Sequence, residues 1–360
     1  MSKLLVGQSI PMHLENGTTP FGIACTYFSG RAVRDRFGYL NQFSNLNWSD
    51  KIDPIPTPKS YSLGYLMDQR ASEFLGKSVS AQWSGGVDSS ALILALIKAG
   101  ISKEDLVILY DQDSVNEYPK LYNWLVKEKY QLKKVTNWRI DLAKADTDLI
   151  TNGWCADQLF GSVFFYQFPD KYHLPIKKLL KSTPTLSGHL TDKQIAFAVD
   201  VYQKYGKSLF DIDIKTASEL GWFINFIMKW TWVSTYNELY LVRTKNVQKT
   251  KVFYDYFPFQ EWSLNNFNSL NLTNIYGKDA TLYKKELKEY IYSIFKDEEY
   301  LLTKKKHPSW NNRLSTQTKI FPDSIVLKTE TDYKILDVPI PPNPKMPMIS
   351  LDTLFTKFKK

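Results

Sequence analysis

The feature that most constrains this chain is a short apolar strand joined to an apolar helix by two adjacent glycines. Residues Val79–Trp83 are typical of a buried strand, and Ser89–Ala99 have the pattern of an apolar helix that ends at Gly100. A second strand is predicted at Leu106–Tyr110 and another helix at Pro119–Lys129. Strands and helices that alternate in this order predict an α/β fold with a parallel sheet and crossover helices.

The remaining segments differ in character from this α/β pattern. A strand is predicted at Phe21–Phe28, and prolines make Asp53–Pro58 an extended connector. Helical patterns dominate after residue 190. These helices are predicted at Asp192–Tyr205, Thr216–Met228, Trp232–Lys245 and Asp279–Phe295. The predicted domains are an N-terminal extension at 1–58, an α/β core at 59–190, a mainly helical lobe at 191–315 and a C-terminal segment at 316–360.

The C-terminal segment combines a predicted hairpin at Ser324–Asp337, a proline-rich arm and a short amphipathic helix. The apolar face of that helix consists of Leu351, Leu354, Phe355 and Phe358. Its SLxxLF pattern resembles the terminal peptides by which phage polymerases bind sliding clamps. We expect either a protein partner for this helix or packing on the chain's own helical lobe.

Composition excludes several classes of protein. Cys25 and Cys155 are the only cysteines, too few for a disulfide framework or a cysteine-built zinc site, and the four histidines lack metal-ligand spacing. No apolar run has the length of a membrane-spanning helix or the form of a signal peptide, so we expect no membrane association and a cytoplasmic location. The net charge of +9 is compatible with nucleotides or nucleic acid as partners.

The glycine turn has the residue types of a polyphosphate-binding loop. The loop and the first helical turn comprise Ser84, Gly85, Gly86, Val87, Asp88, Ser89 and Ser90. Glycines allow close approach of the backbone to a ligand, and the serine hydroxyls and free N–H groups can donate to phosphate oxygens. The lysine and spacing of a Walker A loop are missing. Because a carboxylate repels a bare triphosphate, Asp88 is predicted to hold Mg²⁺ that bridges the phosphates.

This loop resembles the SGGxDS pyrophosphate loop of the ATP pyrophosphatases, and the chain is similar to the synthetase domain of asparagine synthetases and β-lactam synthetases. Three further blocks, in the family's order, carry the resemblance. The second block of the family, GxGxDExxGGY, corresponds to Gly153–Ser162. The third, the RVPFLD region, corresponds to Val242-Arg243 followed by Tyr256–Glu261. The fourth, KxxLRE with a lysine-rich loop after it, corresponds to Lys284–Glu289 followed by Lys304-Lys305-Lys306.

The resemblance implies a PP-loop core and an ATP-dependent ligase that releases AMP and pyrophosphate. A carboxylate or similar oxygen would attack the α-phosphorus of ATP, and ammonia or an amine would then form an amide or another C–N bond. Asp88 and Asp157 would share Mg²⁺, and Lys305 or Lys306 would neutralise charge that develops in the transition state. Gly153 and Lys284 would contact ATP. For Lys284, a place on a solvated helix surface would explain the lysine equally well.

Departures from the family pattern leave alternatives open. Gln158 replaces a glutamate, which favours a nucleotide-binding protein without turnover. Ser2 stands where the glutaminase domain has its cysteine, so we expect nitrogen from free ammonia, another amine or a separate subunit. The positive charge and Cys155 keep a nucleobase- or tRNA-modifying enzyme as the alternative. An aromatic stretch of the helical lobe either packs a core or lines an acceptor pocket of unknown specificity. It consists of Trp222, Trp230, Trp232, Tyr236 and Tyr240.

Overall fold

A computed structural model describes residues 3–6, 61–160, 174–178, 282–304, 324–328 and 333–337 and, with gaps, residues 199–267. The chain divides into two compact units. One comprises Ile55–Asp170 and Tyr240–Pro308, and the other comprises Met1–Pro54, Lys171–Leu239 and Ser309–Lys360. In the part of the chain that the structure describes, no helix combines the length and the apolar character needed to cross a membrane.

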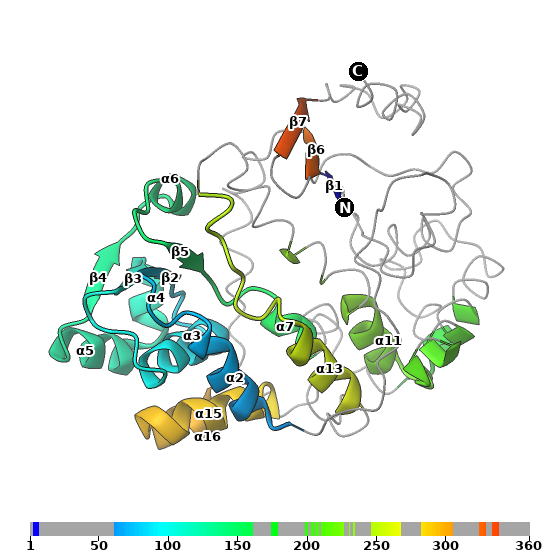
Figure 1. Cartoon of the computed structure of the whole chain (residues 1–360). Coiled ribbons are helices and arrows are strands. Elements are labelled where there is room, and N and C mark those ends of the chain that lie inside the picture. Colours follow the sequence, from blue (N-terminus) through cyan, green and yellow to red (C-terminus); the bar gives the residue numbers. More distant parts are fainter. Residues whose placement is uncertain are drawn as a thin grey trace. The chain divides into compact units, whose positions relative to one another are not determined.

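A four-stranded, all-parallel sheet forms the centre of the first unit (Figure 1). Its order is β4-β3-β2-β5, with β2 at Val79–Gln82, β3 at Leu106–Tyr110, β4 at Gln131–Lys134 and β5 at Leu149–Thr151. The chain passes from β2 outward to β3 and β4 and then returns to the other side of β2. The direction of winding therefore changes between β2 and β5, and ligands of open α/β sheets bind at the carboxyl ends of strands at such a point.

The backbone after residue 248 extends this sheet beyond β5. The N–H of Ile150 donates to the carbonyl of Lys249 at 2.9 Å, and the N–H of Lys251 donates to the carbonyl of Ile150 at 2.8 Å. The bridge between Ile150 and Thr250 is parallel. A segment a hundred residues away in the sequence thus brings its own carboxyl end to the edge where β2 and β5 end.

Helices cover the sheet and join its strands (Figure 1). The bounds are α2 Leu63–Ser72, α3 Val87–Lys98, α4 Gln112–Glu117, α5 Pro119–Lys127, α6 Trp138–Ala143 and α7 Ala156–Leu159. Local signals explain several ends: Ser62 caps α2, Asp111 and Ser114 form a capping box for α4, and Pro119 opens α5. Gly100, at φ +91°, follows the last turn of α3.

Three helices from the later part of the sequence complete this unit. They are α13 Phe257–Asn265, α15 Lys285–Phe295 and α16 Glu298–Thr303. The α3 residues Ser89 to Leu96 are all buried, which requires apolar neighbours on more than one side. Helix α15 packs against α3 and α2 through a face that includes Leu287 and Ile291.

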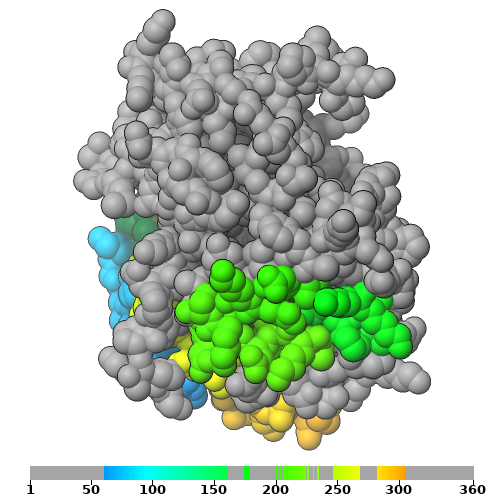
Figure 2. Space-filling model, turned by 90° about the vertical axis from the view of Figure 1, so that its right-hand side faces the viewer, coloured from blue at the N-terminus to red at the C-terminus, as the bar shows by residue number. Residues whose placement is uncertain are grey.

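The second unit has a short sheet and a helix in its described residues. Strand β1 (Lys3–Val6) pairs antiparallel with β6 (Ser324–Lys328), which pairs antiparallel with β7 (Tyr333–Asp337). Helix α11 (Ala217–Ile224) begins with a capping box formed by Thr216 and Glu219. Described residues between 174 and 234 form a green patch on the surface seen in Figure 2, and a bridge joins Pro175 to Thr216.

The structure confirms the α/β class and the parallel sheet. Strand β3 has the predicted bounds, the strand at Val79–Trp83 and the helices near α3, α5, α11 and α15 are present, and the hairpin at Ser324–Asp337 forms. Strand β1 was not predicted, because its partner is more than three hundred residues away in the sequence. The predicted strand at Phe21–Phe28, the connector Asp53–Pro58 and the C-terminal amphipathic helix lie outside the described residues.

Gly76 and Gly85 both have left-handed backbone dihedral angles but different surroundings, and comparing them tests the packing of the β2–α3 loop. Gly76 (φ +70°) has nothing within 4 Å of an added Cβ, so Gly76→Ala should cost only about 1 kcal/mol of left-handed strain. At Gly85 (φ +78°) the Cβ would overlap the backbone oxygen of Ser114, and Gly85→Ala should cost about 3 kcal/mol. Urea unfolding of both variants measures the difference, and equal losses would contradict this packing.

Candidate functional site

The predicted polyphosphate loop lies at the carboxyl end of β2 and is shaped by its own side chains. The N–H of Trp83 donates to the carbonyl of Leu109 at 2.8 Å, which prolongs the β2–β3 ladder. The Ser89 hydroxyl accepts from the N–H of Ser84 at 3.0 Å and donates to the carbonyl of Gly86 at 3.2 Å. The hydroxyls of Ser89 and Ser90 are buried. These two serines therefore hold the loop, and Ser84 and the backbone are left as its more accessible donors.

The N-cap residue of α3 has no side chain that could cap the backbone N–H groups at the helix start. Gly86 is the N-cap residue and makes no capping hydrogen bond, and Val87 and Asp88 begin the helix. Uncapped N–H groups at a helix start, together with the helix dipole, favour an anion.

The loop after β5 passes directly against this helix start. An added Cβ on Gly153 would lie 2.9 Å from the backbone nitrogen of Ser89 and 3.2 Å from Cβ of Asp88. Only glycine therefore allows the two loops to approach so closely. Cys155 is left-handed at φ 72° and buried, as expected for a small packed residue, and it precedes the short helix α7 that carries Asp157.

Lys284 joins the two loop carboxylates. Its Nζ lies 2.5 Å from each carboxylate oxygen of Asp88 and 2.6 Å from Oδ1 of Asp157. Its side chain is 5% exposed, against 23% and 32% for the aspartates. Burial favours the neutral amine, but the charges of Asp157 and Asp88 outweigh it and raise the pKa of Lys284. One buried ammonium thus partly neutralises the negative charges of two carboxylates, which come from α3 and α7.

Two tyrosines support this ion-pair cluster of Asp88, Asp157 and Lys284. The Tyr283 hydroxyl donates to Oδ1 of Asp157 at 2.7 Å, and the Tyr254 hydroxyl donates to the backbone carbonyl of Asp88 at 2.9 Å. Burial raises the pKa of Tyr254 well above its ordinary value, so this hydroxyl stays a donor. Sequence reasoning missed both tyrosines, although Tyr254 lies just before the second part of the predicted third block and Tyr283 just before the fourth block.

A lysine of the predicted lysine-rich loop lies beside the glycine turn. Nζ of Lys304 is 3.1 Å from Oε1 of Glu117, and both side chains are mostly buried. The same Oε1 is 3.5 Å from the position of a Cβ on Gly86, which places Glu117 against the loop. Sequence reasoning chose Lys305 and Lys306 from this run, and these two lysines, like Arg243, lie outside the described residues.

Gln158 is buried at 2% exposure, next to Asp157 in the sequence. Its Oε1 has no hydrogen-bond partner within the described residues. A glutamate at this position would have to bury its charge, which costs far more than burying a neutral amide. A neutral glutamine thus suits the burial of this position.

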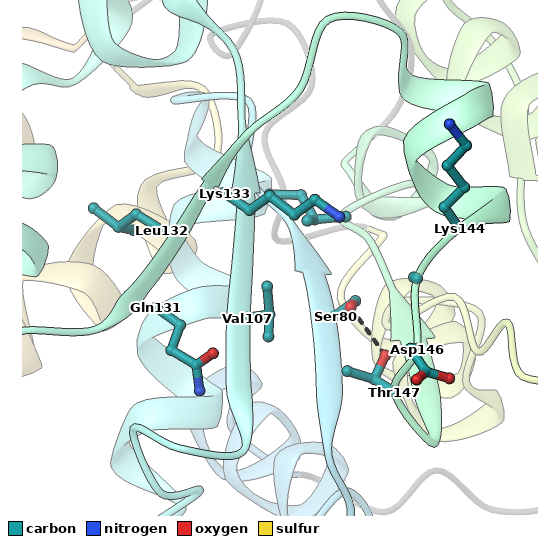
Figure 3. A pocket seen from close by; sticks show the side chains of 10 residues that line it. Ser80, Val107, Gln131, Leu132, Lys133, Lys144, Asp146 and Thr147 are labelled. Atoms are coloured by element: carbon teal, nitrogen blue, oxygen red, sulfur yellow. Dashed lines mark hydrogen bonds between the residues drawn. The ribbon is translucent and has the colours of Figure 1, made fainter.

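A hollow of about 360 Å³ lies on one face of the sheet, lined in part by β2, β3 and β4 (Figure 3). Thr147 donates to the Ser80 hydroxyl there at 2.9 Å, while Lys133 and Lys144 are exposed at its rim. The hollow contains none of the predicted site residues. We therefore place the candidate site at the carboxyl edge of the sheet, where charged groups converge.

Comparison of the sequence with models of known protein families finds none that matches, and comparison with curated proteins finds no significant match. The assignment of a function therefore rests on the motifs and on the geometry of the carboxyl edge.

The cluster predicts unequal costs for two neighbouring substitutions. Lys284→Met removes the only cation that bridges Asp88 and Asp157 in the described structure and should lower the free energy of unfolding by about 2–3 kcal/mol. Tyr283→Phe removes one hydrogen bond and should cost about 1 kcal/mol. Urea unfolding at neutral pH compares them. A Lys284→Met loss no larger than that of Tyr283→Phe would show that the ion pairs contribute little.

Proposed function

We propose that the chain is an ATP-dependent, AMP-forming ligase with a PP-loop core that joins a carboxylate to ammonia or an amine. One observation carries the proposal: Asp88 and Asp157, in the first turns of the helices that follow β2 and β5, converge on one cation at the carboxyl edge of the parallel sheet, beside a glycine turn. A site for a metal-bound polyphosphate needs these elements together.

The two carboxylates fit a divalent cation in a limited sense. Both already lie within 2.6 Å of one ammonium nitrogen, so both can reach a single ion. Within the described residues, no group of three or more His, Cys, Asp or Glu side chains is placed to hold a metal. Asp88 and Asp157 would therefore hold Mg²⁺ together with phosphate oxygens and water, as Mg²⁺ prefers. When bound, Mg²⁺ would neutralise charge on the pyrophosphate.

The protein's own groups have distinct tasks in this reaction. The backbone of Gly85, Gly86 and Val87, with the Ser84 hydroxyl, would bind the β- and γ-phosphates, while Ser89 and Ser90 keep the loop in shape. Lys284, released from the aspartates, would reach the phosphates, and Lys304, Lys305 or Lys306 would neutralise charge in the transition state.

The chemistry consists of two displacements. A carboxylate oxygen of the acid attacks the α-phosphorus and pyrophosphate leaves, which gives an acyl-adenylate. The amine then attacks the acyl carbon, AMP leaves and the amine loses a proton.

The predicted aromatic residues do not locate a pocket for the acceptor substrate. Trp222 and Trp230 are buried in the core of their own unit. The other three, Trp232, Tyr236 and Tyr240, lie outside the described residues.

The proposal is tested by ATP–pyrophosphate exchange, screened over carboxylic acids and over free nucleobases, with the nucleotide product identified. Acid-dependent exchange and AMP release are expected. Exchange only with nucleobases or RNA would assign the protein to base modification instead. ATP binding without release of AMP or pyrophosphate under any condition would contradict the ligase and leave a nucleotide-binding protein.

Asp88→Asn and Asp157→Asn should each lower AMP formation at least about 100-fold, because each removes a charge that faces the pyrophosphate. Asp113→Asn is the matched control, since this exposed aspartate lies in α4, outside the cluster, and should leave the rate unchanged. Circular dichroism verifies the fold of all three variants. If either cluster variant kept more than about a tenth of the turnover, its carboxylate would not be a ligand of the reacting complex.

A further inference from the structure

The cation between the two loop carboxylates is a side chain of the protein itself. Nζ of Lys284 contacts both aspartates at 2.5 and 2.6 Å, and its side chain is almost completely buried. An ammonium in this position supplies the positive charge that would otherwise be supplied by a metal ion. A divalent cation can reach both carboxylates only if Lys284 moves away, because like charges at this distance repel strongly in a buried place.

The backbone of Lys284 is held in place, so any such movement belongs to its side chain. Lys284 is the left-handed N-cap of α15, at φ 54°, and α15 packs on α3 and α2. Tyr283, its neighbour, is tied to Asp157 through its hydroxyl. A displaced ammonium in this buried position needs a new anion, since an unpaired buried charge is costly.

A polyphosphate satisfies both requirements at once. It carries a divalent cation to the aspartates, and it offers phosphate oxygens to the ammonium that the cation displaces. A free divalent cation brings no such anion, so its binding would leave the ammonium of Lys284 buried without a counter-ion, at a large cost in free energy. The site is therefore built to discriminate between a metal ion alone and a metal ion bound to polyphosphate.

We propose that Lys284 is a built-in counter-cation that excludes free divalent metal from Asp88 and Asp157, so that the metal enters only as its polyphosphate complex. This inference rests on the proposed function in that it takes the two aspartates as the metal ligands. It adds an order of assembly: metal and nucleotide arrive together.

The test measures Mn²⁺ binding without nucleotide, by the electron paramagnetic resonance signal of free Mn²⁺. Lys284→Met should bind one Mn²⁺ at least about tenfold more tightly than the wild type, because a repelling charge has been removed. The gain should disappear in Lys284→Met/Asp88→Asn. Lys285→Met is the matched control: Lys285 is 59% exposed, pairs with Glu289, and should behave as the wild type does. Equal Mn²⁺ affinity in the wild type and Lys284→Met would overturn the proposal.

A measurement on the wild type keeps the proposal testable if Lys284→Met does not fold. Magnesium chloride alone should raise the melting temperature of the wild type no more than that of Asp88→Asn. Magnesium with inorganic pyrophosphate should raise it for the wild type only. A rise with magnesium alone that is lost in Asp88→Asn would overturn the proposal.

The failures of this inference and of the proposed function are distinguishable. Release of AMP by a wild type that also binds Mn²⁺ tightly without nucleotide would refute the counter-cation and keep the ligase. Exclusion of free Mn²⁺ by a wild type that never releases AMP would refute the ligase and keep the counter-cation.

Discussion

The ion pairs of Lys284 with Asp88 and Asp157 connect the parts of the α/β unit that are far apart in the sequence. Asp88 lies in the first turn of α3, Asp157 in α7 after β5, and Lys284 at the start of α15. A buried charge of either sign is costly without its partner, so each segment requires the other two in place. The cluster thereby ties the position of the candidate site to the packing of α15 on α3.

This convergence depends on glycine at two points and on the order of the strands. Because β2 and β5 are neighbours whose connections run in opposite directions, the loops that follow them meet at one edge. Gly85 permits the turn beside Ser114, and Gly153 allows the second loop to touch the backbone at Ser89. The same close approach places the ion pairs beside the start of α3, where backbone N–H groups and the helix dipole favour an anion.

Local patterns were sufficient to predict the α/β class, the bounds of β3 and the presence of α3, because a short apolar strand and an apolar helix that ends at a glycine are encoded within a few neighbouring residues. The motifs also selected Asp88 and Asp157, which the structure brings together at one ammonium. They did not identify Lys284 as the group between them, nor Tyr254 as a donor to Asp88. Both side chains reach the site through tertiary packing of segments more than 120 residues away from the aspartates along the chain, which leaves no periodic signal. Strand β1 escaped prediction for the same reason.

The most direct test of this account is a crystal structure with Mg²⁺ and a non-hydrolysable ATP analogue. The account predicts β- and γ-phosphates on the backbone of Gly85, Gly86 and Val87, one Mg²⁺ that contacts Asp88 and Asp157, and the amine of Lys284 moved from the aspartates to a phosphate oxygen. An analogue bound elsewhere, such as the hollow lined by Ser80 and Thr147, with Lys284 still paired to both aspartates, would contradict it.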